Sequence, residues 1–417
     1  MVWHGFTQMA SYLDNAPVIV DHAEGRELVD VDGRRYLDAI SSLWVNTLGH
    51  RVPELDAALT EQLGRVAHST MLGNGNRVVV ELAETLASVV PVDGPHFLFA
   101  SDGAAAIEQA LKIAFQFWVN QDVPGRSGYL AFGGAYHGDT VGSLSLGAGG
   151  FGTDVFDPLR FPVLRAPDFA DRDCFRRAAA MVHGRGEELA AVVLEPLVQG
   201  AAGMQLAPPE GLDELVEACR ERDVLVVCDE VATGFGRTGT LFACEQAGLR
   251  PDLLCLGKGL TGGYLPMSAT VASQRVYEAF LGADLGERTF YHGHSYGGNA
   301  LAAAVALAHL ELLSDGSILE NVRARSEQLA KALDAEVTPL PGVADVRLCG
   351  LMGAVELAPP AAGLRWGRRT CAGAVRRGVL LRPLGDVVVL MPPLTTTADE
   401  IERIAGVLAE AIVEVTA

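Results

Sequence analysis

The sequence predicts an α/β protein in which helices cover a mainly parallel sheet. Short apolar or β-branched runs alternate along the chain with amphipathic stretches of helical spacing, which is the pattern typical of parallel strands joined by helices. The apolar runs are nearly continuous, as expected when both faces of a sheet are covered. Strands are therefore expected at 97–99, 129–132, 191–194, 224–228 and 253–256.

Helices are expected between these strands and on either side of them. One begins at Pro53, a residue favoured in the first helical turn, and carries apolar residues at helical spacing at Leu55, Leu59, Leu63 and Val66. A long buried helix is expected over 300–313. The final helix opens with a capping box formed by Thr397 and Glu400.

The chain is expected to have three parts. Residues 1–48 form an N-terminal segment, residues 49–305 a large domain, and residues 306–417 a smaller α+β domain with strands at 343–357, 379–382 and 387–391. Three N-terminal strands, at 18–20, 27–29 and 36–37, have no helices between them. We expect this segment to pack with the small domain.

Composition excludes several classes of protein. The 417 residues are 49% hydrophobic, enough for two to three domain-sized cores, and the net charge of −20 opposes binding to nucleic acid or to an anionic membrane. The first residues do not resemble a signal peptide, and no apolar run reaches the length of a membrane span, so a cytoplasmic location is expected. Seven scattered cysteines without C-x-x-C spacing suggest neither disulfides nor a zinc site.

Lys258 is one of only three lysines, and it lies between Gly257 and Gly259 directly after an apolar run. Unlike arginine, a desolvated lysine loses its proton at accessible pH and then attacks carbonyl groups to form a Schiff base. The alternative is a surface lysine in a tight turn. The rest of the chain favours the nucleophile.

An acidic pair and a glycine-rich loop follow the strand predicted at 224–228. Residues 234–239 satisfy G-x-G-x-x-G, but a dinucleotide site requires this motif to begin at the strand end and to open directly into a helix. Here residues 229–233 intervene. Asp229 and Val231 are two apart on an extended segment, so both face one side, and they could meet Lys258 at the edge of one sheet.

The run 229–239 with its downstream lysine resembles the class III aminotransferases, which bind pyridoxal phosphate in the type I fold, and the resemblance covers essentially the full chain. It implies that Lys258 forms a Schiff base with the cofactor and moves protons. It implies that Asp229 keeps the pyridine nitrogen protonated, so that the ring accepts electrons. Val231 would pack on one ring face, and Tyr136 would stack on the other.

The same resemblance assigns the cofactor's phosphate to two places. Gly103 and Ala104, at the start of a helix, would supply backbone donors, although the family often has a hydroxyl where this chain has Ala104. A second loop, 291–296, would reach the phosphate from a partner subunit through His294 and Ser295, which implies a homodimer with shared active sites. The two histidines of that loop are weak evidence for a metal.

Within the family, six segments resemble the branch that converts 8-amino-7-oxononanoate to 7,8-diaminononanoate in biotin biosynthesis: 3–9, 41–44, 68–73, 136–140, 198–204 and 382–386. Arg382 would then bind the substrate carboxylate as a bidentate donor. Trp44 and Tyr136 would line the apolar chain of the substrate. The remaining implied contacts to substrate come from Phe6, Lys258 and Gly293.

The resemblance implies S-adenosylmethionine as the amino donor, with lysine as the alternative. Users of S-adenosylmethionine commonly carry tyrosine, tryptophan and tyrosine where this chain has Phe6, Leu43 and Val389, while the loops 293–296 and 382–386 are more similar to a lysine-using branch. Two further alternatives remain. One is an aminotransferase of diamines or other ω-amino acids, and the other is a cofactor-binding regulator without turnover, which would not need Lys258 and Asp229 together.

Overall fold

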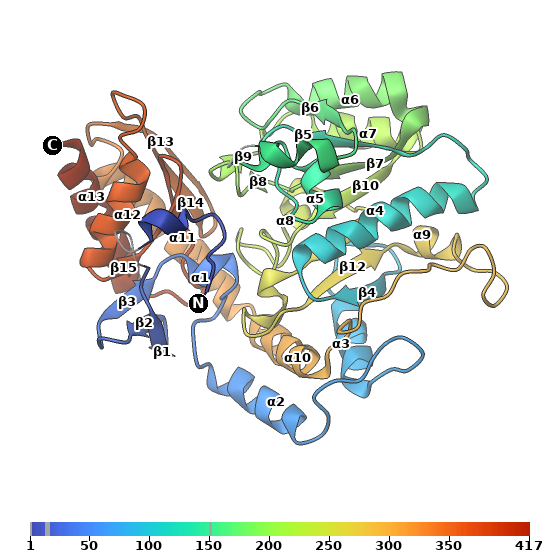
Figure 1. The fold of residues 1–417 in the computed structure, drawn as a ribbon, viewed down its shortest axis with the longest axis horizontal. Helices are drawn as coiled ribbons and strands as arrows, with labels where there is room; N and C mark the ends of the chain where they lie inside the picture. The colour runs from blue at the N-terminus through green and yellow to red at the C-terminus, as the bar shows by residue number, and fades with distance from the viewer. Residues whose placement is uncertain (1, 13–16, 150–151) are drawn as a thin grey trace.

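The computed structural model describes residues 2–12, 17–149 and 152–417. Figure 1 shows two bodies of secondary structure. One is built around a large sheet, and the other gathers the C-terminal helices and the N-terminal strands. The helix α10 (Ala300–Ser314) runs beneath them and leads from the first body towards the second.

The large sheet has seven strands, in the order β4-β12-β11-β10-β7-β5-β6. Every pair in it is parallel except those of β12, which is antiparallel to both neighbours. The predicted mainly parallel sheet is confirmed, and the five predicted strands are found within two residues at each end; β6 and β12 were not predicted. The strands are β4 (His96–Ala100), β5 (Gly128–Phe132), β6 (Leu164–Ala166), β7 (Leu189–Leu194), β10 (Leu225–Asp229), β11 (Leu253–Leu256) and β12 (Ser268–Ala272).

Helices cover both faces of this sheet, which explains its continuous apolar runs. On β10 and β11, Val227 and Cys255 join a core formed with α4 (Gly103–Asn120), whereas Cys228 and Leu254 join the core on the opposite face. The other helices of this body are α2 (Pro53–Leu63), α3 (Arg77–Ala87), α5 (Val141–Leu146), α6 (Cys174–Arg185), α7 (Leu212–Glu221), α8 (Ala243–Ala247) and α9 (Gln274–Glu278), with short 3-10 turns η3 (Thr153–Leu159), η4 (Gly186–Glu188) and η5 (Lys258–Thr261).

The helix predicted from Pro53 is confirmed, but its apolar face is shorter than expected. Leu55 is fully buried, whereas Leu63 is 61% exposed and Val66, 40% exposed, lies beyond the end of the helix. The spacing of the two leucines is helical, but in the last turn Gln62 is buried and Leu63 faces outward. The helix predicted at 300–313 is confirmed as α10.

A second, antiparallel sheet of order β13-β14-β17-β16 lies in the C-terminal part. The strand predicted at 379–382 is wrong as a single strand. Leu380 pairs with Asp38 in one sheet and Arg382 pairs with Val389 in another, because the chain passes between sheets at the buried Leu381. The elements are β13 (Val343–Cys349), β14 (Met352–Leu357), β15 (Val379–Leu380), β16 (Arg382–Leu384), β17 (Val387–Leu390), α11 (Ser317–Glu336), α12 (Trp366–Arg376) and α13 (Ala398–Thr416), the last with the predicted capping box.

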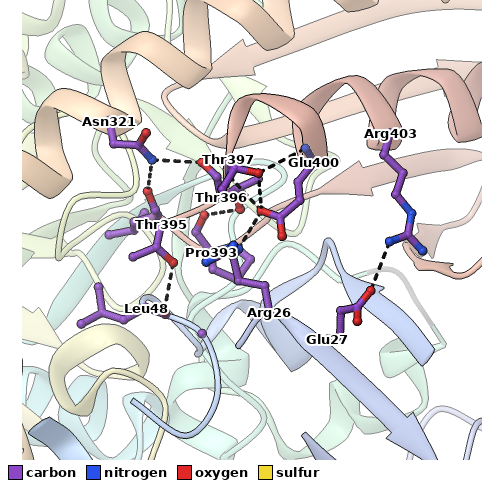
Figure 2. Close-up of polar contacts among 12 residues, drawn as sticks. Arg26, Glu27, Leu48, Asn321, Pro393, Thr395, Thr396, Thr397, Glu400 and Arg403 are labelled. Carbon is purple, nitrogen blue, oxygen red and sulfur yellow. Dashed lines mark hydrogen bonds and ion pairs between the residues drawn. The ribbon is translucent and has the colours of Figure 1, made fainter. Parts of the chain in front are cut away.

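The N-terminal strands β1 (Val20–Glu24), β2 (Glu27–Asp30) and β3 (Arg35–Asp38) form a third sheet with β15, to which β3 is parallel. The first strand begins at Val20 and not at residue 18 as predicted. Figure 2 shows this sheet fastened to the C-terminal helix, where Arg26 Nε donates to Glu400 at 2.6 Å and Arg403 donates to Glu27 at 3.2 Å. The division of the chain at residues 48 and 305 stays a prediction; residue 305 falls inside α10.

Three small elements complete the described chain: α1 (Ser41–Trp44), the 3-10 turn η1 (Met9–Ser11) and a hairpin of β8 (Val198–Gln199) and β9 (Gln205–Leu206). Within the described ranges, no single helix has the length and apolar content needed to cross a bilayer. Only α10 and α11 taken together pass that test, and a bend of 68° separates them.

Candidate active site

A cavity of about 840 Å³ opens at the carboxyl ends of the large sheet. Residues that follow β4, β5, β7, β10 and β11 all line it, which is the position at which open α/β sheets bind ligands. The lining includes most of the predicted residues, namely Trp44, Gly103, Ala104, Tyr136, Asp229, Val231 and Lys258. The strand ends therefore bring to one edge residues as far apart in the sequence as Gly103, after β4, and Lys258, after β11.

Lys258 begins η5, directly after β11, with a left-handed backbone (φ +39°). The glycines on either side of it permit close packing: a Cβ at Gly259 would lie 3.1 Å from both Phe235 and Thr47. Burial lowers the pKa of the Lys258 amine, and the carboxylates of Asp229 and Glu195 oppose that shift. The residue is half-buried, and it lines the cavity. A desolvated amine that still faces a cavity is available as a nucleophile.

Asp229 ends β10, beside the strand that carries Lys258. Its Oδ2 lies 2.7 Å from Nδ1 of His137, and its Oδ1 accepts the Val231 amide at 3.0 Å. The side chains of Asp229 and His137 are almost fully buried. His137 Nε2 has no hydrogen-bond partner among the described residues. The carboxylate is thus held in one orientation at the wall of the cavity.

The second member of the acidic pair, Glu230, faces away from the cavity. Its carboxylate accepts the amides of Ala243 and Cys244, each at 2.7 Å, at the start of α8. Because successive residues of an extended segment face opposite sides, only Asp229 reaches the site. The glycine-rich loop 234–239 neither begins at the end of β10 nor opens directly into α8, which starts at Ala243, so the dinucleotide interpretation has no structural support.

Glu195 lines the cavity from the end of β7, and sequence reasoning missed it. Its two oxygens accept the amides of Tyr136 at 3.2 Å and Gly200 at 3.0 Å, so it joins the two loops that flank the cavity. Burial, together with the neighbouring charge of Asp229, raises the pKa of Glu195 to about 7, while His137 opposes the shift. The signal was available: Glu195 follows a predicted strand at the same sheet edge as Asp229.

The start of α4 forms a backbone cradle at the cavity. Asp102 caps the helix by accepting the Ala105 amide at 2.9 Å. A Cβ at Gly103 would lie 2.6 Å from Val231 Cγ1, and a Cβ at Gly138 would lie 2.4 Å from that of Ala104. The helix start therefore approaches the strand end and the Tyr136 loop so closely that glycine is required at both positions. The free amides of a first helical turn favour an anion there.

Tyr136 and Trp44 supply the aromatic walls. The Tyr136 hydroxyl donates to Asp139 at 3.0 Å, and burial, with that carboxylate, raises the pKa of the phenol. The Trp44 ring centroid lies 5.4 Å from the Lys258 amine. The Trp44 N–H has no hydrogen-bond partner within the described part of the chain, although the residue is only 7% exposed.

The remaining predicted residues lie outside the described lining of this cavity. Phe6 is 68% exposed. Gly293, His294 and Ser295 lie on an exposed loop, where His68 Nε2 donates to the Ser295 carbonyl at 2.7 Å. Arg382 lies on β16 and is half-buried. The roles of these residues stay predictions.

Two of the positions discussed for the amino donor also lie outside the lining. Leu43 is 46% exposed, whereas Val389 is fully buried in a small core that also contains Trp44. Across 2–12, 17–149 and 152–417, no group of three or more His, Cys, Asp or Glu side chains is arranged to hold a metal ion.

Comparison with known proteins identifies the family of the chain. The sequence profile of the class III aminotransferases matches residues 8–412. The adenosylmethionine-8-amino-7-oxononanoate aminotransferase of Nitratidesulfovibrio vulgaris is 46% identical, over 100% of this chain and 80% of that protein, and that of Geobacter sulfurreducens is 40% identical, over 100% and 96%.

Solved structures show the same relationship. The crystal structure of the adenosylmethionine-8-amino-7-oxononanoate aminotransferase from Methanocaldococcus jannaschii superposes with a TM-score of 0.96 at 38% identity, covering 99% of this chain and 97% of that one. An amine transaminase from an uncultivated Pseudomonas species, in its pyridoxal-phosphate-bound form, gives 0.91 at 32% identity, covering 100% and 98%.

Proposed function

The chain belongs to the class III aminotransferase family, and from this premise we propose that it converts 8-amino-7-oxononanoate to 7,8-diaminononanoate, a step of biotin biosynthesis, with S-adenosylmethionine as amino donor. The observation that carries the proposal is that a desolvated Lys258 amine and the buried Asp229 carboxylate line the same cavity. The relatives named for this reaction supply the substrate.

The residues present fit pyridoxal 5′-phosphate as the cofactor. The close approach of Gly103 to Val231 leaves a cradle that any larger side chain would fill, and the first turn of α4 offers amides for a phosphate. Asp229 would hold the protonated ring nitrogen, and Val231 and Tyr136 would contact the ring from the cavity walls. The bound cofactor supplies an electron sink for negative charge on the carbon that carries the amine.

The chain's own residues bind substrate and move protons. Lys258 Nζ has a lowered pKa, so it can take a proton from the reacting carbon and return it in the reverse half-reaction. His137 and the Val231 amide keep the Asp229 carboxylate oriented. Trp44 and Tyr136 would exclude water from the apolar chain of the substrate, and Arg382 would bind its carboxylate, assisted by Phe6 and Gly293.

We further propose a homodimer in which the loop 291–296 of one subunit completes the other subunit's site through His294 and Ser295. The support is that this loop lies outside its own cavity and exposes two aromatic residues, Tyr291 at 65% and Tyr296 at 63%. A cytoplasmic location is proposed because all seven cysteines are free, as in proteins of reducing compartments.

A stopped-flow experiment tests the reaction. Protein loaded with pyridoxal phosphate is mixed with S-adenosylmethionine, lysine, or a short ω-amino acid, and the absorbance of the bound aldehyde cofactor is followed. The expected result is a rapid loss of that absorbance with S-adenosylmethionine and its recovery on adding 8-amino-7-oxononanoate. Lys258→Ala should give neither change, because the amine that moves the proton is gone.

Each other outcome identifies an alternative. Reaction with lysine but not with S-adenosylmethionine would replace the proposed donor, in line with the absence of aromatic or hydroxyl side chains at Leu43 and Val389. Reaction with ω-amino acids and no recovery by 8-amino-7-oxononanoate would favour a general ω-aminotransferase. An active Lys258→Ala variant would remove the central claim.

A further inference from the structure

The backbone that carries Trp44 into the active site is strained. Three of the four residues of α1, Ser41, Ser42 and Trp44, have positive φ angles of 52°, 59° and 66°. L-residues populate this region sparsely, and such conformations persist only where the surrounding structure enforces them. Hydrogen bonds at both ends of the turn 41–44 enforce this conformation.

The buried carboxylate of Asp38 holds the near end of the turn. Its Oδ1 and Oδ2 accept the Ser42 amide at 2.9 and 2.8 Å, and its Oδ2 lies 3.3 Å from the Ser42 hydroxyl and 3.0 Å from His50 Nε2. The Asp38 side chain is fully buried. One carboxylate therefore organises both the strained turn and the segment that follows it.

The neighbouring hydrogen bonds fix the tautomer of His50. The Asn46 amide nitrogen, which can only donate, lies 3.1 Å from His50 Nδ1, while Asn46 Oδ1 accepts the Gly49 amide at 2.7 Å. Nδ1 of His50 must then accept, so the proton is on Nε2 and points at Asp38. The contact between His50 and Asp38 is thus a directed hydrogen bond to a carboxylate.

Residues 46 and 47, which follow the turn, are held by hydrogen bonds, one of them to the loop that follows the reactive lysine. Buried Arg237 donates to the Asn46 carbonyl at 2.6 Å, and the Thr47 amide donates to the Gly262 carbonyl at 3.3 Å. A Cβ at Gly263 would lie 2.7 Å from the backbone of Asn46. The turn and the Lys258 loop therefore pack backbone to backbone.

Trp44 links the strained turn to the active site. Its ring centroid lies 5.4 Å from the Lys258 amine, and a Cβ at Gly200 would lie 3.3 Å from Cζ3 of the ring. The indole thus lies close to both the reactive amine and the loop held by Glu195. A shift of the turn would move the aromatic wall against which Lys258 and the substrate are placed.

Resting on the proposed function, we propose that Asp38 is a positioning residue: by enforcing the strained turn 41–44, it holds the Trp44 indole over the Lys258 amine. Asp38 does not line the cavity and acts through Trp44. Replacing Asp38 should release the turn, misplace the indole and slow both half-reactions.

A double-mutant cycle between Asp38→Asn and Trp44→Ala tests this. We expect Asp38→Asn to lower kcat/KM by about 10- to 100-fold, as for a displacement of roughly 1 Å in an active site. In the Trp44→Ala background the same change should cost little more, because its effect is already lost. Independent, multiplying losses would overturn the proposal.

Asp30→Asn is the matched control. Asp30 is also a buried carboxylate of the N-terminal sheet, and it accepts two backbone amides and the Tyr36 hydroxyl, but its partners lie away from the cavity. It should lower thermal stability without changing kcat/KM. Equal kinetic losses in Asp30→Asn and Asp38→Asn would reduce Asp38 to a general stability residue.

Hydrogen exchange on the cofactor-free protein gives a readout that does not depend on activity. In Asp38→Asn, a peptide covering 39–50 should exchange faster than in the parent, while a peptide covering 27–36 should not; unchanged exchange at 39–50 would overturn the proposal. If Asp38→Asn fails to fold, His50→Gln replaces it in both experiments, and it should give a smaller effect in the same direction. A parent enzyme without aminotransferase activity would refute the proposed function alone, because the exchange result would still report on the turn.

Discussion

Replacing Gly103 by alanine should push the start of α4 away from the end of β10. The new Cβ would lie 2.6 Å from Val231 Cγ1 and 3.0 Å from its Cγ2, distances at which one partner must shift. Overpacking of this kind costs roughly 1–3 kcal/mol. Gly103 is the first residue of α4, so the preference of about 0.5–1 kcal/mol for alanine over glycine in the middle of a helix returns only part of this cost. We expect a net loss of about 1–2 kcal/mol in the free energy of unfolding of the cofactor-free protein, measured with urea.

The same displacement should disturb the amides at the helix start. We expect the displaced amides to bind the phosphate less well by a similar free energy. Because about 1.4 kcal/mol corresponds to a tenfold change in an equilibrium constant, the dissociation constant of pyridoxal phosphate should rise by about tenfold. Titration of the cofactor-free variant, followed by absorbance, measures this constant separately from turnover.

Val231→Ala is the decisive companion change, because it removes both methyl groups that the new Cβ would meet. The nearest remaining atom, the Val231 Cβ, lies 3.3 Å away, so the double variant should be more stable than Gly103→Ala alone. Gly184→Ala is the control: it lies in α6 with no atom within 4 Å of the new Cβ, and it should stabilise by about 0.5–1 kcal/mol. A Gly103→Ala variant as stable as the parent, or a double variant weaker than both singles, would refute the packing argument.

Three further predictions follow from the site. Asp229→Asn should retain cofactor but lose several orders of magnitude in kcat, because an amide no longer favours a protonated ring nitrogen; near-normal single-turnover rates would contradict that role. Glu195 has a pKa of about 7 in the folded chain against 4.5 in the unfolded one, so the folded chain keeps a proton that the unfolded chain has lost between those values. The free energy of unfolding should therefore fall as the pH rises from about 4.5 to about 7, by at most about 3.4 kcal/mol. Glu195→Gln should abolish this part of the fall in urea titrations at each pH; an unchanged slope would show that the carboxyl ionises normally. Arg382→Ala should weaken 8-amino-7-oxononanoate by roughly 2–5 kcal/mol and the donor much less, and equal losses in the two half-reaction constants would make Arg382 structural.

Local sequence was enough to predict five of the seven strands of the large sheet and its mainly parallel arrangement. Continuous apolar runs predict buried parallel strands because both faces of each strand meet a core, and β10 and β11 divide their residues between two cores as that argument requires. The same logic places Asp229 and Lys258 at neighbouring strand ends. Local patterns failed in two places. The apolar spacing continues to Val66, although the helix ends at Leu63, and the single strand predicted at 379–382 divides between two sheets.

Only tertiary structure decided which polar groups serve the site. Nothing near Asp229 in the sequence shows that His137, 92 residues earlier, fixes its carboxylate, or that Glu230 turns away to cap α8. The sequence by itself determined the residue types, the strand ends and the glycines that allow close approach. The fold decided the pairings, because hydrogen bonds and desolvation depend on distances in space between segments that the chain brings together only when the whole sheet edge is assembled.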